Sequence, residues 1–592
     1  MKKRVADIVM DVLVENGITV CFSVVGGGAM HLDNALALND KINKVFNHHE
    51  QACAMAAEGY AKACGKMAAV CVTSGPGALN TLNGVEGAYV DNVPMIVIAG
   101  HPRWDTTVNV TGLNLRYRGV QEYDIIPSVE GMTKYAKMVT DPLSIKRELQ
   151  RAINIANQGR KGPTWLSIPL DIQSKIVEMD ELYPIEPIAQ LKYTLTNEKI
   201  YELNRLITDS NRPVILPGSG VRTGNAIDEF RQFASKMNIP IVSGALLPDI
   251  MWESADNFYG TSGNVGERRG NFILQNADLI IAIANSLALK QTGFNQDAFA
   301  PNAKIVMIDA GEDEFKKPGV KADFEIYCDA KTFLNEANRS INPWNTKQDW
   351  IDYCDSVKEI LGDIDEPVMG DSMSRVPQAL FWKIVNEKMP ENAMVALGNS
   401  PGGCGRLQHA IKHPNQRVIV NYNSGSMGDD LPEAIGMIVS GADEVICATG
   451  DGSIMMNLQE LQTIKMHNYN IKIVVFSNEG YGAIRQTNKN FFDGLYIGCD
   501  DKSGVSMPDF EKIAMAFDIP FKRCDNIGQL TESIQWLFDN NGPLLLDLCQ
   551  EIDDPVMPKV MSKMREDGSF FTPPLQDMYP YISDEKMNQL ML

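Results

Sequence analysis

A short glycine-rich segment in the last third of the chain carries the residue types of a phosphate and metal site. Gly450-Asp451-Gly452-Ser453 directly follows the apolar run 445–449 and precedes a helical pattern. A strand that leads through a glycine turn into a helix lets backbone N–H groups approach phosphate oxygens. The carboxylate of Asp451 fits such a site only when a cation lies between it and the phosphate. Mg²⁺ takes oxygen ligands and bridges carboxylate to phosphate, so we expect a magnesium–phosphate site here.

A second loop, about 25 residues further along, offers complementary ligands. The apolar run 473–476 is followed by Asn478, Gly480 and Tyr481. Because parallel strands present their carboxyl ends at the same edge of a sheet, we expect this loop beside Asp451. Asn478 would supply a side-chain oxygen and Gly480 a backbone carbonyl to the same cation. Two unrelated strand–loop–helix turns are the alternative, and the pairing of the loops favours the site.

An acidic residue in the N-terminal part opens another helical pattern. Glu50 follows His48 and His49 and precedes the run of small residues 51–64. A glutamate in the first turn of a helix is favoured by the helix dipole, and this alone would explain Glu50. A buried carboxyl group also has a raised pKa, which suits it to share a proton in catalysis.

The two glycine loops together resemble the metal–diphosphate signature of thiamine-diphosphate-dependent enzymes. The resemblance implies that Asp451, Asn478 and the Gly480 carbonyl bind Mg²⁺, which in turn binds the diphosphate of the cofactor. Ser477 stands where the family usually has the first of two asparagines, and the second, metal-binding asparagine is present. The cofactor-binding residues expected in these loops are Asp451, Gly452, Ser453, Asn478, Gly480 and Tyr481.

The surroundings of Glu50 resemble the pyrimidine-binding domain of the acetolactate synthase-like branch of that family. The similarity covers segments 46–51 and 74–77, the second of which reads Ser-Gly-Pro-Gly. It implies that the Glu50 carboxyl group hydrogen-bonds the aminopyrimidine ring and activates the cofactor. With this resemblance, we interpret Glu50 as the first candidate for a catalytic residue and no longer as an acid that only stabilises the start of a helix.

His49 and Gln121 are further catalytic candidates. His49 could transfer protons beside Glu50, and a structural hydrogen bond is an equal alternative. Segment 119–122, Gly-Val-Gln-Glu, resembles the Phe-Gln-Glu segment of the family with valine in place of phenylalanine. By that resemblance Gln121 reaches the reacting centre from the neighbouring subunit. A polar surface loop is the alternative for Gln121.

Segment 424–434 supplies a third match to the family. In the family a bulky side chain, here Met427, supports the cofactor in its bent conformation. Backbone groups of Gly425 and Met427 would hold the aminopyrimidine. Because the chain has 29 methionines, Met427 taken alone would be an ordinary loop or core residue. Asp429 and Glu433 make the segment more acidic than the family pattern, which would alter the surroundings of the cofactor.

Apolar runs and helical patterns alternate along the whole chain, which predicts an α/β fold with three domains of parallel sheet flanked by helices. Two polar stretches with proline, 182–190 and 362–377, are typical of linkers. The expected domains are an N-terminal pyrimidine-binding domain (1–182), a central domain (191–345), a C-terminal diphosphate- and Mg-binding domain (376–555) and a tail (556–592) that would act as a lid. The expected strands are 69–73, 95–99, 214–216, 279–284, 304–308, 445–449, 473–476 and 544–548, and the expected helices are 51–64, 227–237 and 458–466.

The central domain contains a strand–helix–strand unit around Gly218-Ser219-Gly220. Its spacing is not GxGxxG, so the signal for a dinucleotide is weak. In acetolactate synthases this domain binds FAD, but the usual arginine-rich segment here reads Asn-Ser-Leu-Ala-Leu-Lys-Gln over 285–291, and FAD is not favoured. An NAD-dependent dehydrogenase would explain this unit alone and leave the other motifs unexplained.

Composition and charge argue against several classes of partner. The 592 residues include 54 Lys and Arg against 75 Asp and Glu, a formal net charge of −21. Nucleic acid and anionic membrane surfaces are therefore not expected as partners, and no apolar run reaches the roughly 18 residues of a membrane span. Asp7 and Asp11 interrupt the apolar start of the chain, which predicts an amphipathic helix and no signal peptide. The 11 cysteines form no CxxC pair, and a cytoplasmic location is predicted.

The resemblance implies decarboxylation of a 2-oxo acid, with pyruvate as the first candidate, and carboligation to an acceptor carbonyl. This is the activity of a transferase of the acetolactate synthase type, which depends on thiamine diphosphate and Mg²⁺. The expected assembly is a homodimer or homotetramer in which Glu50 of one chain faces Met427 and Asp451 of another.

The same scaffold also serves decarboxylases and C–C bond hydrolases that act on sugar-derived or cyclic oxo substrates. Segments 290–294, 498–500 and 573–578 resemble acetolactate synthase-like proteins of bacterial polysaccharide loci, and a cyclohexanedione hydrolase-like subgroup is also similar. Thr487 stands where the biosynthetic enzyme has its specificity tryptophan, which argues against branched-chain biosynthesis. A non-catalytic paralogue is a third alternative, which the intact Glu50 disfavours.

Overall fold

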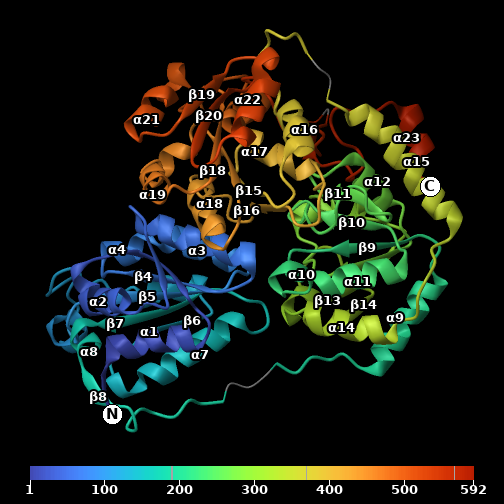
Figure 1. The fold of residues 1–592 in the computed structure, drawn as a ribbon. Coiled ribbons are helices and arrows are strands. Elements are labelled where there is room, and N and C mark those ends of the chain that lie inside the picture. The colour runs from blue at the N-terminus through green and yellow to red at the C-terminus, as the bar shows by residue number, and fades with distance from the viewer. Residues whose placement is uncertain (188–190, 368–369, 566, 568) are drawn as a thin grey trace.

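The fold consists of three six-stranded parallel sheets with helices on both faces (Figure 1). The computed structural model describes residues 1–187, 191–367, 370–565, 567 and 569–592. The predicted three-domain α/β fold is confirmed, and each strand and helix predicted from the sequence begins and ends within two residues of an observed element. Residues 188–190 and 368–369, which fall in the two predicted linkers, lie outside the described residues.

The first sheet has the strand order β3-β2-β4-β5-β7-β6. Helices α1, α2 and α7 cover one face, and α3 and α5 cover the other. Helix α3 has alanine at six of its 15 positions and buries 11 residues, so neighbouring elements approach its backbone closely. The strands are β2 (Val20–Val24), β3 (Asn43–Phe46), β4 (Ala68–Val72), β5 (Met95–His101), β6 (Tyr135–Met138) and β7 (Thr164–Pro169), with the antiparallel pair β1 (Lys2–Arg4) and β8 (Ile176–Glu178) beside them. The helices are α1 (Val5–Glu15), α2 (Met30–Leu38), α3 (Glu50–Cys64), α4 (Pro76–Asn80), α5 (Leu82–Val90), α6 (Ile126–Val129), α7 (Ile145–Asn157) and α8 (Leu170–Gln173).

The central sheet has the order β11-β10-β9-β12-β13-β14, so the direction of winding reverses between β9 and β12. Ligands of open α/β sheets bind at such a switch point, and a cavity of about 410 Å³ opens there, bordered by Gly218, Lys290 and Asp309. The strands are β9 (Pro213–Pro217), β10 (Ile241–Gly244), β11 (Phe258–Ser262), β12 (Leu279–Ile283), β13 (Lys304–Asp309) and β14 (Phe324–Tyr327). The helices are α9 (Asn197–Asp209), α10 (Gly220–Thr223), α11 (Ile227–Met237), α12 (Arg268–Gln275), α13 (Leu289–Thr292) and α14 (Ala330–Ser340).

The third sheet has the order β16-β15-β17-β18-β20-β19. Helices α18, α19 and α21 pack on one face in a single apolar core with α3 and α5 of the first domain, whereas α16 and α22 pack on the other face. The strands are β15 (Met394–Leu397), β16 (Arg417–Val420), β17 (Val445–Gly450), β18 (Ile471–Ser477), β19 (Phe521–Cys524) and β20 (Leu544–Cys549). The helices are α16 (Gln378–Lys388), α17 (Pro401–Cys404), α18 (Asp430–Val439), α19 (Glu460–His467), α20 (Gly482–Phe491), α21 (Phe510–Ala516) and α22 (Ile527–Asp539).

Helix α15 (Gln348–Asp365) extends into the segment predicted as the second linker. Gly362 lies inside this helix, because Trp350, Val357 and Leu361 bury one face of it against the central domain. The tail packs on the same side of the central domain through α23 (Asp584–Leu590) and carries the short hairpin of β21 (Lys563–Met564) and β22 (Phe570–Phe571). No helix in the described part of the chain combines the length and apolar character needed to cross a membrane.

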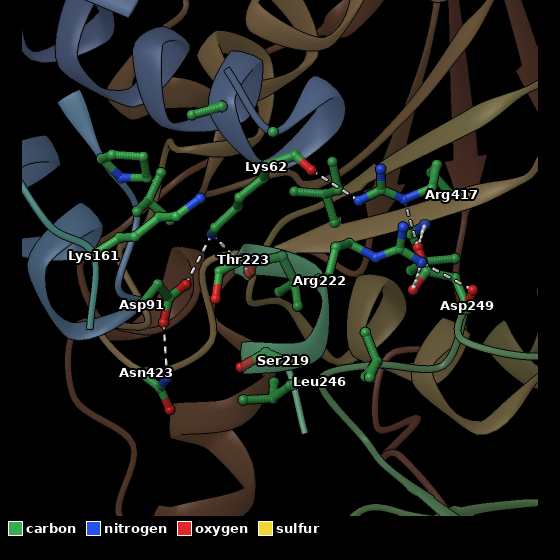
Figure 2. Close-up of a pocket in the computed structure, with 18 residues that line it drawn as sticks. Lys62, Asp91, Lys161, Ser219, Arg222, Thr223, Leu246, Asp249, Arg417 and Asn423 are labelled. Carbon is green, nitrogen blue, oxygen red and sulfur yellow. Dashed lines mark hydrogen bonds and ion pairs between the residues drawn. The ribbon is translucent and has the colours of Figure 1, made fainter. Parts of the chain in front are cut away.

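The three domains meet at the C-terminal end of α3 (Figure 2). Arg417 at the start of β16 donates from Nη1 and Nη2 to the carbonyls of Ala63 and Lys62, at 2.7 and 2.8 Å. Its Nε lies 2.8 Å from the carboxylate of Asp249 in the central domain, which also pairs with Arg222 at 2.9 Å. Although burial raises it, the pKa of Asp249 is held below its ordinary value by the two guanidinium groups. A small cavity of about 70 Å³ lies beside this junction.

Candidate functional site

The predicted metal ligands meet at the carboxyl ends of β17 and β18. These strands are paired in register, so the loops after them leave the sheet side by side. Oδ2 of Asp451 accepts the backbone N–H groups of Asn478 and Gly480, each at 3.1 Å. Asp451 and Asn478 are 2% and 5% exposed. The structure therefore brings all three predicted ligands into one buried cluster.

The donor set of this cluster fits Mg²⁺. The side-chain oxygen Oδ1 of Asn478 is buried and has no hydrogen-bond partner among the described residues. A buried acceptor without a donor needs a partner from outside the chain, and a hard cation binds such oxygens. Burial raises the pKa of Asp451 to about 6, so its carboxyl group is ionised at neutral pH. No group of three or more His, Cys, Asp or Glu side chains among the described residues is arranged to hold a metal.

Two positions in these loops, Gly452 and Gly480, have no room for a side chain. A Cβ atom at Gly452 would overlap the ring of Tyr481, and one at Gly480 would overlap the carbonyl oxygen of Cys499. Gly480 also has φ of 132°, a backbone conformation that L side chains rarely adopt. The N–H of Tyr481 donates to the Cys499 carbonyl at 2.9 Å, which closes the loop. Both glycine positions are therefore tightly packed, and phosphate binding by the backbone N–H of Gly452 stays a prediction.

Ser453 connects the diphosphate loop to the loop of Met427. Its hydroxyl accepts the N–H of Gly428 at 2.8 Å and donates to the Asp430 carboxylate at 2.7 Å. Because both hydrogen bonds of the hydroxyl are made within the chain, the backbone N–H of Ser453 is the group that we expect to bind the cofactor. Met427 is half-buried, and Gly425, with φ of 72°, is exposed. The two predicted cofactor segments thus lie next to each other in the third domain.

Glu50 begins helix α3 and faces a glycine turn. Its Oε2 accepts a hydrogen bond from Asn80 Nδ2 at 3.0 Å. Its Oε1 lies 3.2 Å from the position that a Cβ of Gly77 would take, and Thr73 Cγ2 lies 2.7 Å from the same position, so only glycine leaves room there. Sequence reasoning missed Asn80, although its place just after the Ser-Gly-Pro-Gly segment was a usable signal. His49 is the N-cap of α3, where Nδ1 accepts the N–H of Gln51 at 3.2 Å, which is the structural alternative named for it.

Gln121 lies at the same glycine turn. A Cβ at Gly75 would come within 3.0 Å of the Gln121 Cβ and carbonyl oxygen, and Gln121 itself is exposed with φ of 55°. The buried carboxylate of Glu122 anchors the loop by accepting N–H groups from Val108 at 2.6 Å and Gly119 at 2.8 Å. The structure therefore places Gln121 beside Gly75 and Glu50 beside Gly77 of the same turn.

The N-terminal end of α3 also contacts the third domain of the same chain. Asn457 Nδ2 donates to the carbonyl of Gly428 at 2.6 Å and lies 3.5 Å from Oε1 of Gln51. Glu460 accepts from Asn47 Nδ2 at 2.8 Å and from the His48 N–H at 3.0 Å. The predicted pyrimidine and diphosphate domains are thus packed together within one chain. The division of each site between two chains stays a prediction.

One of the two acidic residues after Met427, Glu433, forms a contact between domains. Glu433 on α18 lies 3.2 Å from the ammonium group of Lys62 on α3, which also contacts Glu58 and Asp91 at 2.6 and 2.8 Å. Burial raises the pKa of Glu58 to about 8 and that of Glu433 to about 6. Burial also raises the pKa of Asp429. The contact of Glu433 with Lys62 accounts for one of the two departures from the family pattern.

The fold is that of a class of enzymes with thiamine-diphosphate-binding domains. Three family models match the chain: the N-terminal TPP binding domain over 3–122, the central domain over 200–337 and the C-terminal TPP binding domain over 401–548 of thiamine pyrophosphate enzymes. The chain belongs to the thiamine pyrophosphate enzyme family, as the resemblance of its motifs predicted.

Acetolactate synthases are among its relatives. The probable acetolactate synthase large subunit of Methanococcus aeolicus is 30% identical over 569 residues, which cover 92% of this chain and 91% of the relative. Acetolactate synthase 2, chloroplastic, of Nicotiana tabacum is 29% identical over 574 residues, or 95% of this chain and 84% of the relative. The acetolactate synthase isozyme 2 large subunit of Escherichia coli (strain K12) is 28% identical over 559 residues, or 93% and 96%.

Proposed function

We propose that this protein decarboxylates a 2-oxo acid, with pyruvate as the first candidate, and joins the remaining carbon unit to an acceptor carbonyl. The observation that carries the proposal is the buried cluster of Asp451, Asn478 and Gly480, in which the Asn478 Oδ1 has no partner among the described residues. Similarity to acetolactate synthases over more than nine-tenths of the chain supports the reaction type.

Different residues of the chain would bind the metal, bind the diphosphate and carry the proton in such a reaction. Thiamine diphosphate supplies, when bound, the carbon nucleophile and the acceptor for the electron pair that carbon dioxide leaves behind. Asp451, Asn478 and the Gly480 carbonyl would hold Mg²⁺, and the backbone at Gly452 would bind diphosphate oxygens. Glu50 would hold a proton at its carboxyl group, and the bond from Asn80 keeps that group in one direction.

The loop of Gln121 and the tail complete the proposal. The hairpin of β21 and β22 contacts the end of α20 through Phe570 and Phe491, with ring centroids 5.5 Å apart, which supports the predicted lid. The apolar side chains of Tyr117 and Val120 in the Gln121 loop are 75% and 80% exposed. Exposed apolar patches commonly mark contacts between proteins, which supports a homodimer or homotetramer with shared sites. The cytoplasm stays the predicted location.

A decarboxylase or C–C bond hydrolase for a sugar-derived or cyclic oxo substrate is the second candidate. The observation that favours it is Thr487, an exposed residue of α20 that stands where the biosynthetic enzymes have tryptophan. The resemblance to the polysaccharide-locus and cyclohexanedione hydrolase-like subgroup points the same way. Both candidates use the same cofactor. A decarboxylase would release the carbon unit as an aldehyde instead of joining it to an acceptor, whereas a hydrolase would cleave a C–C bond of its substrate with water.

Mass spectrometry of the products tests the proposal. Purified protein is incubated with thiamine diphosphate, Mg²⁺ and pyruvate, alongside Glu50→Gln and the exposed control Glu130→Gln. Acetolactate from the wild type and the control, with a loss of at least about 100-fold in Glu50→Gln, supports the reaction. Cofactor binding without turnover of pyruvate would favour the second candidate. Equal activity in all three proteins would contradict the role of Glu50.

A further inference from the structure

The loop that carries the predicted metal ligands, residues 477–480, is held by a buried arginine. Arg485 on α20 is only 3% exposed. Its Nη2 donates to the carbonyl oxygen of Asn478 at 2.6 Å, and its Nη1 donates to that of Glu479 at 3.3 Å. The guanidinium group thus binds two successive carbonyls of the metal loop, directly beside the side chain expected to hold the ion.

The backbone of this loop has an unfavourable conformation that needs such support. Glu479 has φ of 63°, and Gly480 follows with φ of 132°. A left-handed conformation is uncommon for a residue with a side chain and persists where the surroundings impose it. The bonds from Arg485 go to the carbonyls of the two peptide groups that flank Glu479, so they fix the direction of the turn. That direction decides where Asn478 Oδ1 and the Gly480 carbonyl point.

Arg485 also ties the loop to the segment that leaves β20. The same Nη2 donates to the carbonyl of Ile552 at 2.7 Å, and Nε lies 3.8 Å from Oδ1 of Asp553. A second arginine, Arg375, donates to the Ser477 carbonyl at 2.7 Å, but its side chain is 31% exposed. Because a planar guanidinium offers several fixed donors, one buried Arg485 binds three carbonyls at once.

We propose that Arg485 is a positioning residue for the magnesium site, because it holds the strained turn at Glu479 so that Asn478 and Gly480 face the ion. The proposal rests on the proposed function, since it concerns the same metal. Arg485 touches neither cofactor nor substrate in this role. It acts through the backbone carbonyls of the loop, as outer partners orient the ligands of many metal sites.

The test measures Mg²⁺ binding by calorimetry, with thiamine diphosphate at saturation, in wild type, Arg485→Gln and Arg485→Lys. Removal of an outer partner typically weakens metal binding 10- to 100-fold, so Arg485→Gln should raise the Mg²⁺ dissociation constant by about that factor. Arg485→Lys keeps the charge but reaches fewer carbonyls, so its Mg²⁺ dissociation constant should lie between those of the wild type and Arg485→Gln. It also supplies the test if Arg485→Gln does not fold.

The matched control is Arg406→Gln in the same domain. Arg406 is fully buried and donates to Asn386 Oδ1 at 3.1 Å and to the His409 carbonyl. Arg406→Gln should therefore lower the melting temperature by as much as Arg485→Gln does. The Mg²⁺ dissociation constant of this control should equal that of the wild type. Hydrogen exchange of the protein without ligands gives a second readout, in which the amides of 478–482 should exchange faster in Arg485→Gln alone.

The outcomes separate the inference from the proposed function. Wild-type Mg²⁺ affinity in both Arg485 variants would overturn the role of Arg485 and leave the metal site intact. Equal weakening in Arg406→Gln would also overturn it, because the effect would then follow from general destabilisation. If the wild type bound neither Mg²⁺ nor thiamine diphosphate, the proposed function would fail and this inference with it.

Discussion

The ammonium nitrogen of Lys62 lies 3.2 Å from Oε1 of Glu433, and this ion pair joins helices of the first and third domains. Lys62 is shared with Glu58 and Asp91, at 2.6 and 2.8 Å. The side chains of Glu58 and Glu433 are fully buried, so their negative charge is poorly solvated. Burial raises the pKa of Glu58 to about 8, because a single ammonium group cannot balance three carboxylates in this poorly solvated environment.

The stability of the protein should therefore fall as the pH rises from 6 to 8.5. Glu58 loses its proton near pH 4.5 in an ordinary environment and near pH 8 in the folded protein. The folded state binds more protons than the unfolded state within this window, so each rise in pH favours unfolding. Calorimetry should show a lower melting temperature at pH 8.5, with a loss of about 1–3 kcal/mol from this group. Glu58→Gln should flatten the profile and Glu130→Gln should not; an unchanged slope in Glu58→Gln would contradict the assignment.

Arg417→Gln should weaken the junction of the three domains. The substitution removes the donors to the carbonyls of Ala63 and Lys62 and leaves Asp249 with Arg222 as its remaining ion-pair partner. Loss of one partner of a buried ion pair costs about 3–5 kcal/mol, which urea unfolding should detect. Arg205→Gln is the matched control, because Arg205 is half exposed and forms only surface ion pairs, worth under about 1 kcal/mol. Equal costs in both variants would argue against the junction.

Gly480→Ala should abolish or strongly reduce Mg²⁺ and thiamine diphosphate binding. The added Cβ overlaps the Cys499 carbonyl, and φ of 132° is unfavourable for alanine. The loop must shift, and its ligands with it, so we expect at least a tenfold loss of affinity in calorimetric titrations. Gly362→Ala, on the open side of α15, should instead stabilise the protein by about 0.5–1 kcal/mol. Normal binding by Gly480→Ala would exclude this loop from the site.

Removal of residues 558–592 should destabilise the central domain. Arg268 of α12 donates to the carbonyls of Met578 and Pro580, at 2.9 and 2.5 Å, and Asn271 donates to that of Leu575 at 3.1 Å. Truncation leaves these buried donors without acceptors, at a cost of about 1–3 kcal/mol each. The melting temperature should fall in the truncated protein and, by less, in Arg268→Gln.

The same pair of variants tests the lid. If the hairpin near Phe491 excludes water, the truncated protein should release more aldehyde and less ligated product, whereas Arg268→Gln retains the hairpin and should keep the product ratio. Gas chromatography of both products measures the ratio. An unchanged ratio after truncation would remove the lid from the mechanism.

The sequence by itself determined the elements and the local chemistry of the site. Val and Ile runs that end in Asp451 and Asn478 indicate strands buried on both faces, and the carboxyl ends of neighbouring parallel strands must meet. The small residues of α3 and the glycines at 452 and 480 are similarly local signals. The start of the second linker was predicted wrongly, because residues 362–365 belong to α15. The composition around Gly362 resembles a loop, whereas packing of Trp350 and its neighbours continues the helix.

Only the tertiary structure decided which distant residues act on those elements. No sequence pattern indicates three contacts of this kind. They are the hydrogen bond from Asn80 to Glu50, the contact of Lys62 with Glu433 across 371 positions, and the hydrogen bonds from Arg485 to the metal loop. Periodicity reports which face of an element is buried, but not which element covers it. The partner of a buried charge depends on how separate domains pack, since only a polar group brought close in three dimensions offsets the cost of removing that charge from water.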